Sequence, residues 1–325
     1  MTGTNESEGI PDIEALRAAA ARIRGRVRRT PVVRAPSLDA RLGCEAWLKC
    51  EQLQPTGAFK LRGASNAIAL LGERGVDGDV ATHSSGNHGA ALARAAKAAG
   101  RNARVVMPEN AVREKVDAVR AHGGEVIFCA PTQADREAGL EAQVARGCIP
   151  VPPYDHPDII AGQGTAALEL FEQAPALDCL VVPVGGGGLL AGCAIAAGAI
   201  APATEVIGAE PAGAADTAAS FARGTRVGAW TPDTIADGLR ALVGRMNFAL
   251  IRQRVDAVLL ADDEAIVAAM RLALDSADLR LEPSAAVALA VIAGHRERFA
   301  GRRVGVMLTG GNVDLERFPW LAPAA

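Results

Sequence analysis

The stretch QPTGAFKLRGASN, residues 54–66, decides how this chain folds and points to its chemistry. Lys60 stands at its centre, after a Pro-Thr-Gly turn and the aromatic Phe59. The apolar residues at positions 61, 64, 67 and 68 recur with the spacing of an amphipathic helix, and Thr56 is a candidate cap for it. Lys60 is therefore expected at a turn-to-helix junction, where an apolar neighbour removes part of its solvation. Partial desolvation favours the neutral amine, which attacks carbonyls and forms Schiff bases.

Most lysines are solvated surface groups, so this interpretation depends on what accompanies Lys60 elsewhere in the chain. The chain has 325 residues, of which 50% are apolar and 22% charged, enough for two globular domains. A net charge of −3 and an aromatic content of 3% argue against partners such as nucleic acid or an anionic membrane surface. The N-terminus shows no secretory signal, so a cytosolic protein is expected.

Two further features of composition bear on the class of protein. Residues 179–204 carry no charge and are long enough to span a bilayer, but Pro183 and four glycines interrupt them. A buried strand, a glycine loop and a buried helix fit this stretch better than a membrane span. The six cysteines form no C-x-x-C pair and no zinc spacing, which indicates reduced and mostly buried thiols.

The rest of the chain alternates short apolar runs with amphipathic segments. Strands are expected at 32–33, 46–48, 80–82, 103–107, 125–129, 180–184, 206–209 and 304–308. Helices are expected at 12–27, after Lys60, and at 90–99, 112–121, 135–146, 164–173, 189–201, 263–277 with Asp262 as cap, and 285–294. Such alternation predicts an α/β fold with parallel sheets covered by helices. Residues 75–153 are expected to form a small mobile domain, inserted in a large one made of 1–74 and 154–325.

Three glycine-bearing turns each follow an expected strand: SSGNHG at 84–89, GGGG at 185–188 and TGGN at 309–312. Loops at the carboxyl ends of parallel strands line the ligand crevice. Four glycines before a helix let backbone N–H groups approach a phosphate, although the spacing is neither a Walker A loop nor a dinucleotide fingerprint. A lysine suited to an aldehyde and a cradle suited to a phosphate together indicate pyridoxal 5′-phosphate as the cofactor.

At this point the chain resembles the fold type II pyridoxal-phosphate enzymes, in the branch of the serine/threonine dehydratases and serine racemases. The resemblance implies a tryptophan synthase β-like fold, with two open parallel-sheet domains and the active site in the cleft between them. It also implies a homodimer. The matching motifs, in family order, are TGAFKLRGASNA at 56–67, THSSGNHG at 82–89, IAGQGT at 160–165, VVPVGGGGLLAG at 181–192, GAEP at 208–211, TIADG at 234–238, LEPS at 281–284 and LTGGNVD at 308–314.

Carried over position by position, the resemblance implies a set of cofactor and substrate contacts. Lys60 binds the aldehyde and takes the Cα proton, Phe59 packs on the cofactor ring, and Thr309 faces the pyridine nitrogen. A hydroxyl there does not keep that nitrogen protonated as a carboxylate would, which favours prompt loss of a β-hydroxyl over transamination. The other implied contacts are Asn87 on the phenolic oxygen, Gly185, Gly186, Gly187 and Gly188 on the phosphate, and Ser84, Ser85, Asn87, His88 and Arg136 on the substrate.

A second implied site would bind a divalent cation, Mg²⁺, Mn²⁺ or Ca²⁺. Its ligands would be the carboxylates of Glu210 and Asp216 and the backbone carbonyl of Ala214, on the loop GAEPAGAAD. Oxygen ligands on a tight loop suit such hard cations. The ion would be structural or activating rather than catalytic.

The leading expectation is a pyridoxal-phosphate-dependent ammonia-lyase that converts L-threonine or L-serine to a 2-oxo acid and ammonia. An alternative is a serine or aspartate racemase, in which Ser85 would return the proton on the face opposite Lys60. Another is a 3-hydroxyaspartate dehydratase, which needs an extra cation for the second carboxylate, with Arg136 and Arg240 as candidates. A cofactor-binding protein without catalysis is the non-enzymatic alternative, and the intact set of site residues argues against it.

Overall fold

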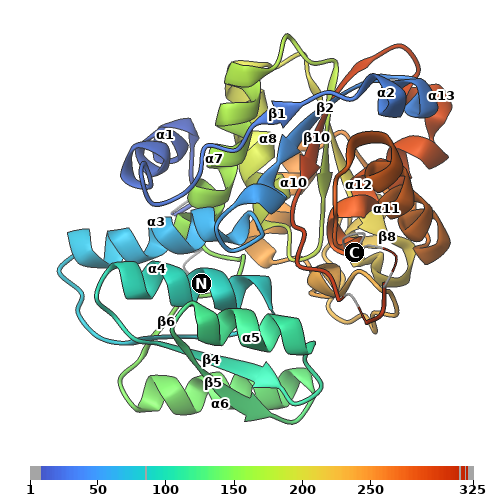
Figure 1. Cartoon of the computed structure of the whole chain (residues 1–325). Helices are drawn as coiled ribbons and strands as arrows, with labels where there is room; N and C mark the ends of the chain where they lie inside the picture. Colours follow the sequence, from blue (N-terminus) through green and yellow to red (C-terminus); the bar gives the residue numbers. More distant parts are fainter. Residues whose placement is uncertain (1–8, 85, 315, 319, 321–325) are drawn as a thin grey trace.

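The computed structural model describes residues 9–84, 86–314, 316–318 and 320, in which ten strands form two sheets (Figure 1). The larger sheet has the strand order β1-β2-β10-β7-β8-β9 and the smaller one β5-β4-β3-β6. The strands are β1 (Val32–Val33), β2 (Glu45–Cys50), β3 (Val80–His83), β4 (Ala103–Pro108), β5 (Gly124–Cys129), β6 (Ile149–Pro150), β7 (Cys179–Pro183), β8 (Glu205–Pro211), β9 (Ala257–Ala261) and β10 (Arg303–Leu308).

Helices separate most of these strands along the chain. They are α1 (Ile13–Arg22), α2 (Pro36–Leu42), α3 (Lys60–Glu73), α4 (Asn87–Ala98), α5 (Arg113–Ala121), α6 (Gln133–Ala145), α7 (Pro157–Gln173), α8 (Gly188–Ile200), α9 (Asp216–Arg223), α10 (Arg245–Arg254), α11 (Asp263–Ala277), α12 (Pro283–Gly294) and α13 (Arg296–Phe299). Three short 3₁₀ helices complete the set: η1 (Glu51–Leu53), η2 (Ala212–Ala214) and η3 (Asp237–Leu239).

The larger sheet is parallel apart from the β1–β2 pair, and helices bury both of its faces. Alternate residues of β7 point to opposite faces, so Val181 belongs to one apolar core and Val182 to the other. Helices α2, α11 and α12 contribute to the first core, and α1, α7, α8 and α10 to the second. Burial on both faces explains why the central strands are continuously apolar.

The smaller sheet is parallel throughout, with α4 and α5 on one face and α6 on the other (Figure 1). Helix α3 lies between the two sheets, because its apolar residues Leu61, Ala64 and Ile68 pack in the core of the smaller sheet while it also contacts α7. The two parallel sheets confirm the expected fold class. The domain limits at residues 75 and 153 stay a prediction.

Most of the predicted elements are present, and three of the predictions were wrong in detail. Asp262 does cap α11, since its carboxylate accepts the N–H of Ala265 at 2.8 Å. Thr56 does not cap α3, which begins at Lys60 with Phe59 in the cap position. The residues between Thr56 and Lys60 are instead held by an antiparallel bridge between Ala58 and Gly310.

The second error concerns the IAGQGT motif at 160–165, which lies wholly inside α7. Helix α7 begins at Pro157, seven positions before the predicted start at 164, and the His156 ring caps it by accepting the N–H of Asp158 at 3.2 Å. Proline in the first turn is a known start signal that the sequence reasoning passed over. The third error is the helix predicted at 12–27, which is shorter in the structure because α1 ends at Arg22.

Arg62, two residues after Lys60, is the centre of a buried ionic network. Its guanidinium contacts Glu51 at 2.7 and 2.8 Å and Glu169 at 2.8 and 2.7 Å, and Lys49 joins Glu169 at 2.6 Å. The side chains of Arg62 and Glu51 are both 0% exposed. Burial by itself raises the pKa of Glu51, but the charge and hydrogen bonds of Arg62, together with Thr30 and Lys49, outweigh it, and the pKa lies below its usual range. The network therefore anchors the first turn of α3 to η1 and α7.

Two expectations about chain class can be compared with this structure. In the part of the chain that the structure describes, no helix is both long and apolar enough to cross a bilayer. Residues 179–204 form β7, a glycine loop and α8, as predicted. All six cysteines are unpaired and five are buried, which confirms the prediction of free thiols.

Candidate active site

Lys60 is held at the carboxyl end of the central strand β10. The Phe59 N–H donates to the carbonyl of Thr309, the residue after β10, at 3.0 Å. The Ala58–Gly310 bridge continues this contact on the other side. Two segments about 250 residues apart in the sequence are thus joined by a short antiparallel bridge. The bridge brings Lys60, Phe59 and the buried Thr309 together.

The Lys60 amine is desolvated. Its Nζ donates to the carbonyl of Pro153 at 2.9 Å and lies 5.1 Å from the centre of the Phe59 ring. Burial lowers the pKa of Lys60 to about 8, because no carboxylate offsets the loss of water. An amine with this pKa is partly neutral at physiological pH, as the sequence predicted, and a neutral amine is the form that attacks an aldehyde.

Asn87, the first residue of α4, is oriented by partners from two other segments. Its Nδ2 donates to Glu282 Oε1 at 2.7 Å, and its Oδ1 accepts from Asn312 Nδ2 at 2.9 Å. The same Asn312 amide donates to the Thr56 carbonyl at 2.9 Å. This chain of hydrogen bonds fixes the Asn87 amide against the turn that carries Lys60 and leaves one amide hydrogen for a ligand.

Glu282 has a part in the site that the sequence reasoning did not assign, although its LEPS motif was noted. The carboxyl is 1% exposed, and in the described residues its Oε2 has no hydrogen-bond partner. Burial raises the pKa of Glu282 to about 7, against the opposing charge of Lys115, whose Nζ lies 3.7 Å away. Lys115 from α5 also pairs with Asp237, so the contact joins the helices of the smaller sheet to the larger sheet.

The SSGNHG loop contributes Ser84 and His88 as well as Asn87. The Ser84 hydroxyl oxygen accepts the N–H groups of Gly86 and Gly89 at 3.1 Å each, which shapes the loop and the start of α4. His88 is buried, and burial lowers its pKa to about 3, so the ring is neutral. Its Nε2 donates to the Val151 carbonyl at 3.2 Å, and its Nδ1 has no partner among the described residues. Ser85 lies outside the described residues.

The four glycines at 185–188 connect β7 to α8 and leave no room for side chains. Gly187 has φ +89°, a left-handed conformation that favours glycine. A Cβ on Gly185 would lie 2.8 Å from the backbone of Leu239, and one on Gly188 2.9 Å from the carbonyl of Tyr154. The loop is therefore a bare backbone at the N-terminus of a 13-residue helix, which fits a bound phosphate.

Tyr154 is the residue that sequence reasoning missed and that connects the two parts of the site. A Cβ on Gly186 would lie 2.3 Å from Cγ of the Tyr154 ring, so the ring packs directly on the glycine loop. The preceding residue, Pro153, accepts the hydrogen bond from Lys60. Pro153 and Tyr154 thus connect the Lys60 amine to the glycine loop at 185–188. An amine for the aldehyde and a bare backbone for the phosphate fit pyridoxal 5′-phosphate.

The Gly186→Ala substitution is expected to weaken binding of pyridoxal 5′-phosphate to the apo-protein about 10- to 100-fold, because overpacking costs about 1–3 kcal/mol. Titration followed by visible absorbance measures this affinity. Gly198→Ala, on the helix α8 that follows the glycine loop, is the matched control, because its Cβ would meet only Arg254 Nη1, at 3.5 Å. Equal affinity in the Gly186 variant and the wild type would show that Tyr154 does not pack on the loop.

The expected cation ligands lie together but already have protein partners. The Glu210 carboxylate accepts the N–H groups of Thr217 and Ala218 at 2.9 and 2.8 Å, at the start of α9. Asp216 accepts the N–H of Val243 at 2.8 Å. Burial raises the pKa of both carboxyls, that of Glu210 to about 8, and a bound cation would relieve this. No group of three acidic, His or Cys side chains with metal-site geometry occurs in the described residues, so a cation here depends on the Ala214 carbonyl.

The two arginines suggested for a second carboxylate lie in different surroundings. Arg240 is exposed, and its guanidinium donates to the Thr234 carbonyl at 3.0 and 2.6 Å. Arg136 on α6 donates to the Thr132 carbonyl at 3.3 Å. Burial lowers the pKa of His83, and the charge of Arg136 lowers it further. Arg136 therefore faces the end of β3, whereas Arg240 is occupied elsewhere.

Comparisons with known proteins point to one family. The family described as pyridoxal-phosphate dependent enzyme matches residues 23–310. The β-hydroxyaspartate dehydratase of Paracoccus denitrificans is 43% identical over 312 residues, covering 96% of this chain and 99% of the relative. A serine racemase of Oryza sativa is 42% identical, covering 95% and 94%. The structure of maize serine racemase superposes with a TM-score of 0.91 at 41% identity, covering 95% of this chain and 96% of that one.

Proposed function

This chain belongs to the family of pyridoxal-phosphate dependent enzymes, and from that premise we propose that it removes water and ammonia from a small 3-hydroxy amino acid. The product is a 2-oxo acid. We further propose that 3-hydroxyaspartate is preferred to threonine or serine. The observation that carries the proposal is the desolvated Lys60 amine, joined to the glycine cradle through Pro153 and Tyr154.

The proposed roles of the site residues follow from their contacts. The backbone of Gly185–Gly188 holds the phosphate, and Lys60 binds the aldehyde. The cofactor, when bound, supplies an electron sink for the charge left on Cα. Asn87, fixed between Glu282 and Asn312, offers its free amide hydrogen to the phenolic oxygen. Thr309 presents a hydroxyl rather than a carboxylate to the ring nitrogen, which limits the lifetime of a carbanion and favours elimination.

Lys60 also performs the proton transfer in this proposal. Once the amino group of the substrate has displaced it from the aldehyde, the free Lys60 amine, with a pKa of about 8, takes the Cα proton of the substrate. The C–O bond at Cβ then breaks and the hydroxyl leaves as water, which yields an enamine. Water hydrolyses the enamine to the 2-oxo acid and ammonia. His88 stays neutral and presents the unprotonated Nδ1, so it can accept a hydrogen bond but does not supply a proton.

The preferred substrate differs from the leading expectation of the sequence, which was threonine or serine. The Paracoccus relative with 43% identity is named for β-hydroxyaspartate, and a relative from Saccharomyces cerevisiae with 41% identity is named L-threo-3-hydroxyaspartate ammonia-lyase. Racemisation of serine or aspartate is the second candidate, supported by the rice and maize serine racemases at 42% and 41% identity. In that reaction Ser85 would return the proton on the second face.

Three accompanying expectations rest on the family resemblance and remain proposals. A divalent cation would bind Glu210, Asp216 and the Ala214 carbonyl, where it would offset the two buried carboxylates. The protein would act as a homodimer. It would work in the cytosol.

An assay over the isomers of 3-hydroxyaspartate, serine and threonine tests the function. We expect the purified holoenzyme to release ammonia and a 2-oxo acid from one 3-hydroxyaspartate isomer with a kcat/KM at least about tenfold above that for serine or threonine. Chiral analysis of the remaining substrate measures racemisation in the same reaction. Interconversion of serine enantiomers faster than release of oxo acid from every substrate would favour the racemase instead.

A further inference from the structure

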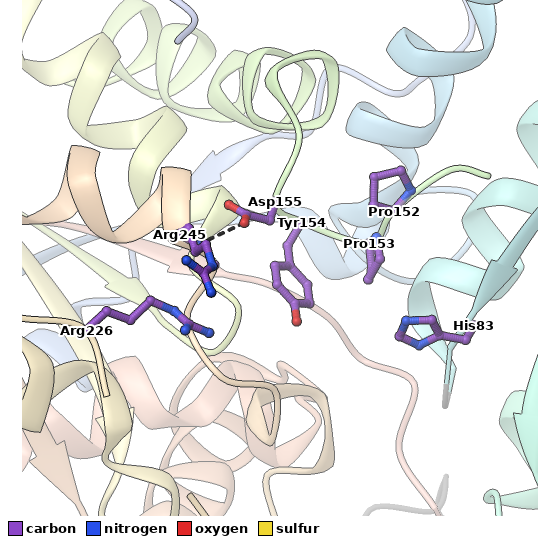
Figure 2. Close-up of a pocket in the computed structure, with 8 residues that line it drawn as sticks. His83, Pro152, Pro153, Tyr154, Asp155, Arg226 and Arg245 are labelled. Carbon is purple, nitrogen blue, oxygen red and sulfur yellow. Dashed lines mark hydrogen bonds between the residues drawn. The ribbon is translucent and has the colours of Figure 1, made fainter. Parts of the chain in front are cut away.

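A cavity of about 260 Å³ opens at Pro153, the residue that accepts from the Lys60 amine, and is lined by two arginines that the reaction above does not use (Figure 2). Pro153, whose carbonyl accepts from Lys60 at 2.9 Å, forms part of its wall. The volume lies just below the range of about 300–1,000 Å³ typical of drug-sized ligands, so it suits a small polar molecule. The lining residues are His83, Pro152, Pro153, Tyr154, Asp155, Arg226, Gly244 and Arg245.

The two arginines reach the cavity from separate elements. Arg245 is the first residue of α10, and Arg226 follows α9. Figure 2 shows both guanidinium groups on one side of the Tyr154 ring, with His83, Pro152 and Pro153 on the other. The cavity therefore has a cationic wall and a wall next to the reactive amine, with a phenol between them.

Within the described residues neither Arg226 nor Arg245 forms an ion pair with a carboxylate inside 4.0 Å. The Arg226 charge nevertheless acts on Asp216, because it opposes the rise that burial causes in the pKa of that carboxyl. Arg226 uses its Nε to donate to the Val243 carbonyl at 2.5 Å. Asp155, the one acid in the lining, accepts the N–H groups of Arg245 and Asn247 at 2.8 and 3.2 Å, so it caps α10.

We propose that Arg226 and Arg245 bind the second carboxylate of a dicarboxylic 3-hydroxy amino acid and so determine substrate choice, an inference that rests on the proposed function. Guanidinium groups match carboxylates geometrically and form hydrogen bonds about twice as strong as those between neutral groups. Serine and threonine have no second carboxylate and leave this wall unpaired. Of the arginines suggested by the sequence, Arg240 is occupied by Thr234, and Arg136 lies on the His83 side.

The cofactor phosphate is the other anion near this wall, because the Tyr154 ring packs on Gly186. Replacing the arginines has different effects on activity depending on whether they bind a substrate carboxylate or the cofactor phosphate. A carboxylate subsite affects only dicarboxylic substrates and inhibitors, and chiefly through KM, because the contact is present in both ground and transition states. A phosphate contact lowers cofactor affinity and reduces turnover of every substrate alike.

The variants Arg226→Met and Arg245→Met test the proposal in the holoenzyme, with Arg252→Met, also on α10 and exposed, as the matched control. For 3-hydroxyaspartate we expect each variant to lower kcat/KM about 10- to 100-fold, mostly by raising KM, because a hydrogen bond to a charged group contributes about 1.5–3 kcal/mol. Activity on serine or threonine should change less than about threefold, and Arg→Lys variants should recover part of the loss.

Other outcomes overturn the inference in distinguishable ways. Equal losses on dicarboxylic and monocarboxylic substrates, or a weaker affinity for pyridoxal 5′-phosphate, would assign the arginines to structure or to the phosphate. Unchanged kinetics would also refute the subsite. If the wild type releases no oxo acid from any isomer, the proposed function fails. In that case calorimetry with succinate tests the carboxylate subsite independently of activity. A subsite at Arg226 and Arg245 requires that the wild type binds succinate and that neither variant does.

Discussion

Replacing Lys60 with alanine is expected to abolish both the visible absorbance of the bound cofactor and turnover of every substrate. The loss in kcat should be at least about 10³-fold, because the same amine binds the aldehyde and transfers the Cα proton. Absorbance spectra and a 2-oxo acid assay on one preparation measure the two effects. The fold should survive, since the Lys60 amine makes one hydrogen bond, to Pro153, and its burial disfavours its charge.

Lys97→Ala is the matched control for this substitution. Lys97 lies on α4 and is exposed, so its loss should leave absorbance and rate unchanged. Circular dichroism would establish that both variants are folded. Substantial turnover by a folded Lys60→Ala protein would contradict the mechanism, and a retained absorbance band would contradict the covalent attachment.

Replacing Arg62 with methionine is expected to give the largest loss of stability among single substitutions near the site. The change leaves Glu51 fully buried beside Glu169 without the cation that both contact. Removing one partner of a buried ion pair costs about 3–5 kcal/mol, which lowers the melting midpoint by roughly 5 °C for a chain of this length. Thermal unfolding of the apo-protein by circular dichroism measures the shift without a contribution from the cofactor.

Arg17→Met removes an ion pair of the exposed kind and serves as the control. Arg17 and Glu14 have side chains that are 59% and 68% exposed, and such pairs contribute about 0.2–1 kcal/mol. Comparable midpoints for the two variants would mean that the buried network does not stabilise the fold. Because Arg62 is in the first turn of α3, the unstable variant should also bind pyridoxal 5′-phosphate less tightly.

The sequence predicted the parts of the site that are determined by neighbouring residues in the chain. Lys60 follows a turn, and the glycine run precedes a helix, so each could be recognised without knowing what lay opposite. Phe59 and Thr309 were matched by motif alone, and the structure joins them by a backbone hydrogen bond. The parallel sheets followed from the alternation of apolar runs with amphipathic segments.

The parts that the sequence did not predict depend on contacts between distant segments. Tyr154 has no motif of its own, and its importance comes from packing on Gly186. Arg226 and Arg245 look like ordinary surface arginines until the cavity brings them together. Glu282 was part of a recognised motif, but its contacts with Asn87 and Lys115 come from residues more than 160 positions away. Pattern and propensity carry no information about such distances.

The contacts of Lys115 and Asn87 with Asp237 and Glu282 place a buried carboxyl at the junction of the two sheets. In the structure burial raises the pKa of Glu282 to about 7, and on exposure to water the carboxyl would return to its ordinary, lower pKa. Exposing this carboxyl would therefore release a proton, so we expect the contact between the sheets to weaken as the pH rises through about 7. Amide hydrogen exchange of α4 and α5, corrected for the intrinsic effect of pH, measures this dependence.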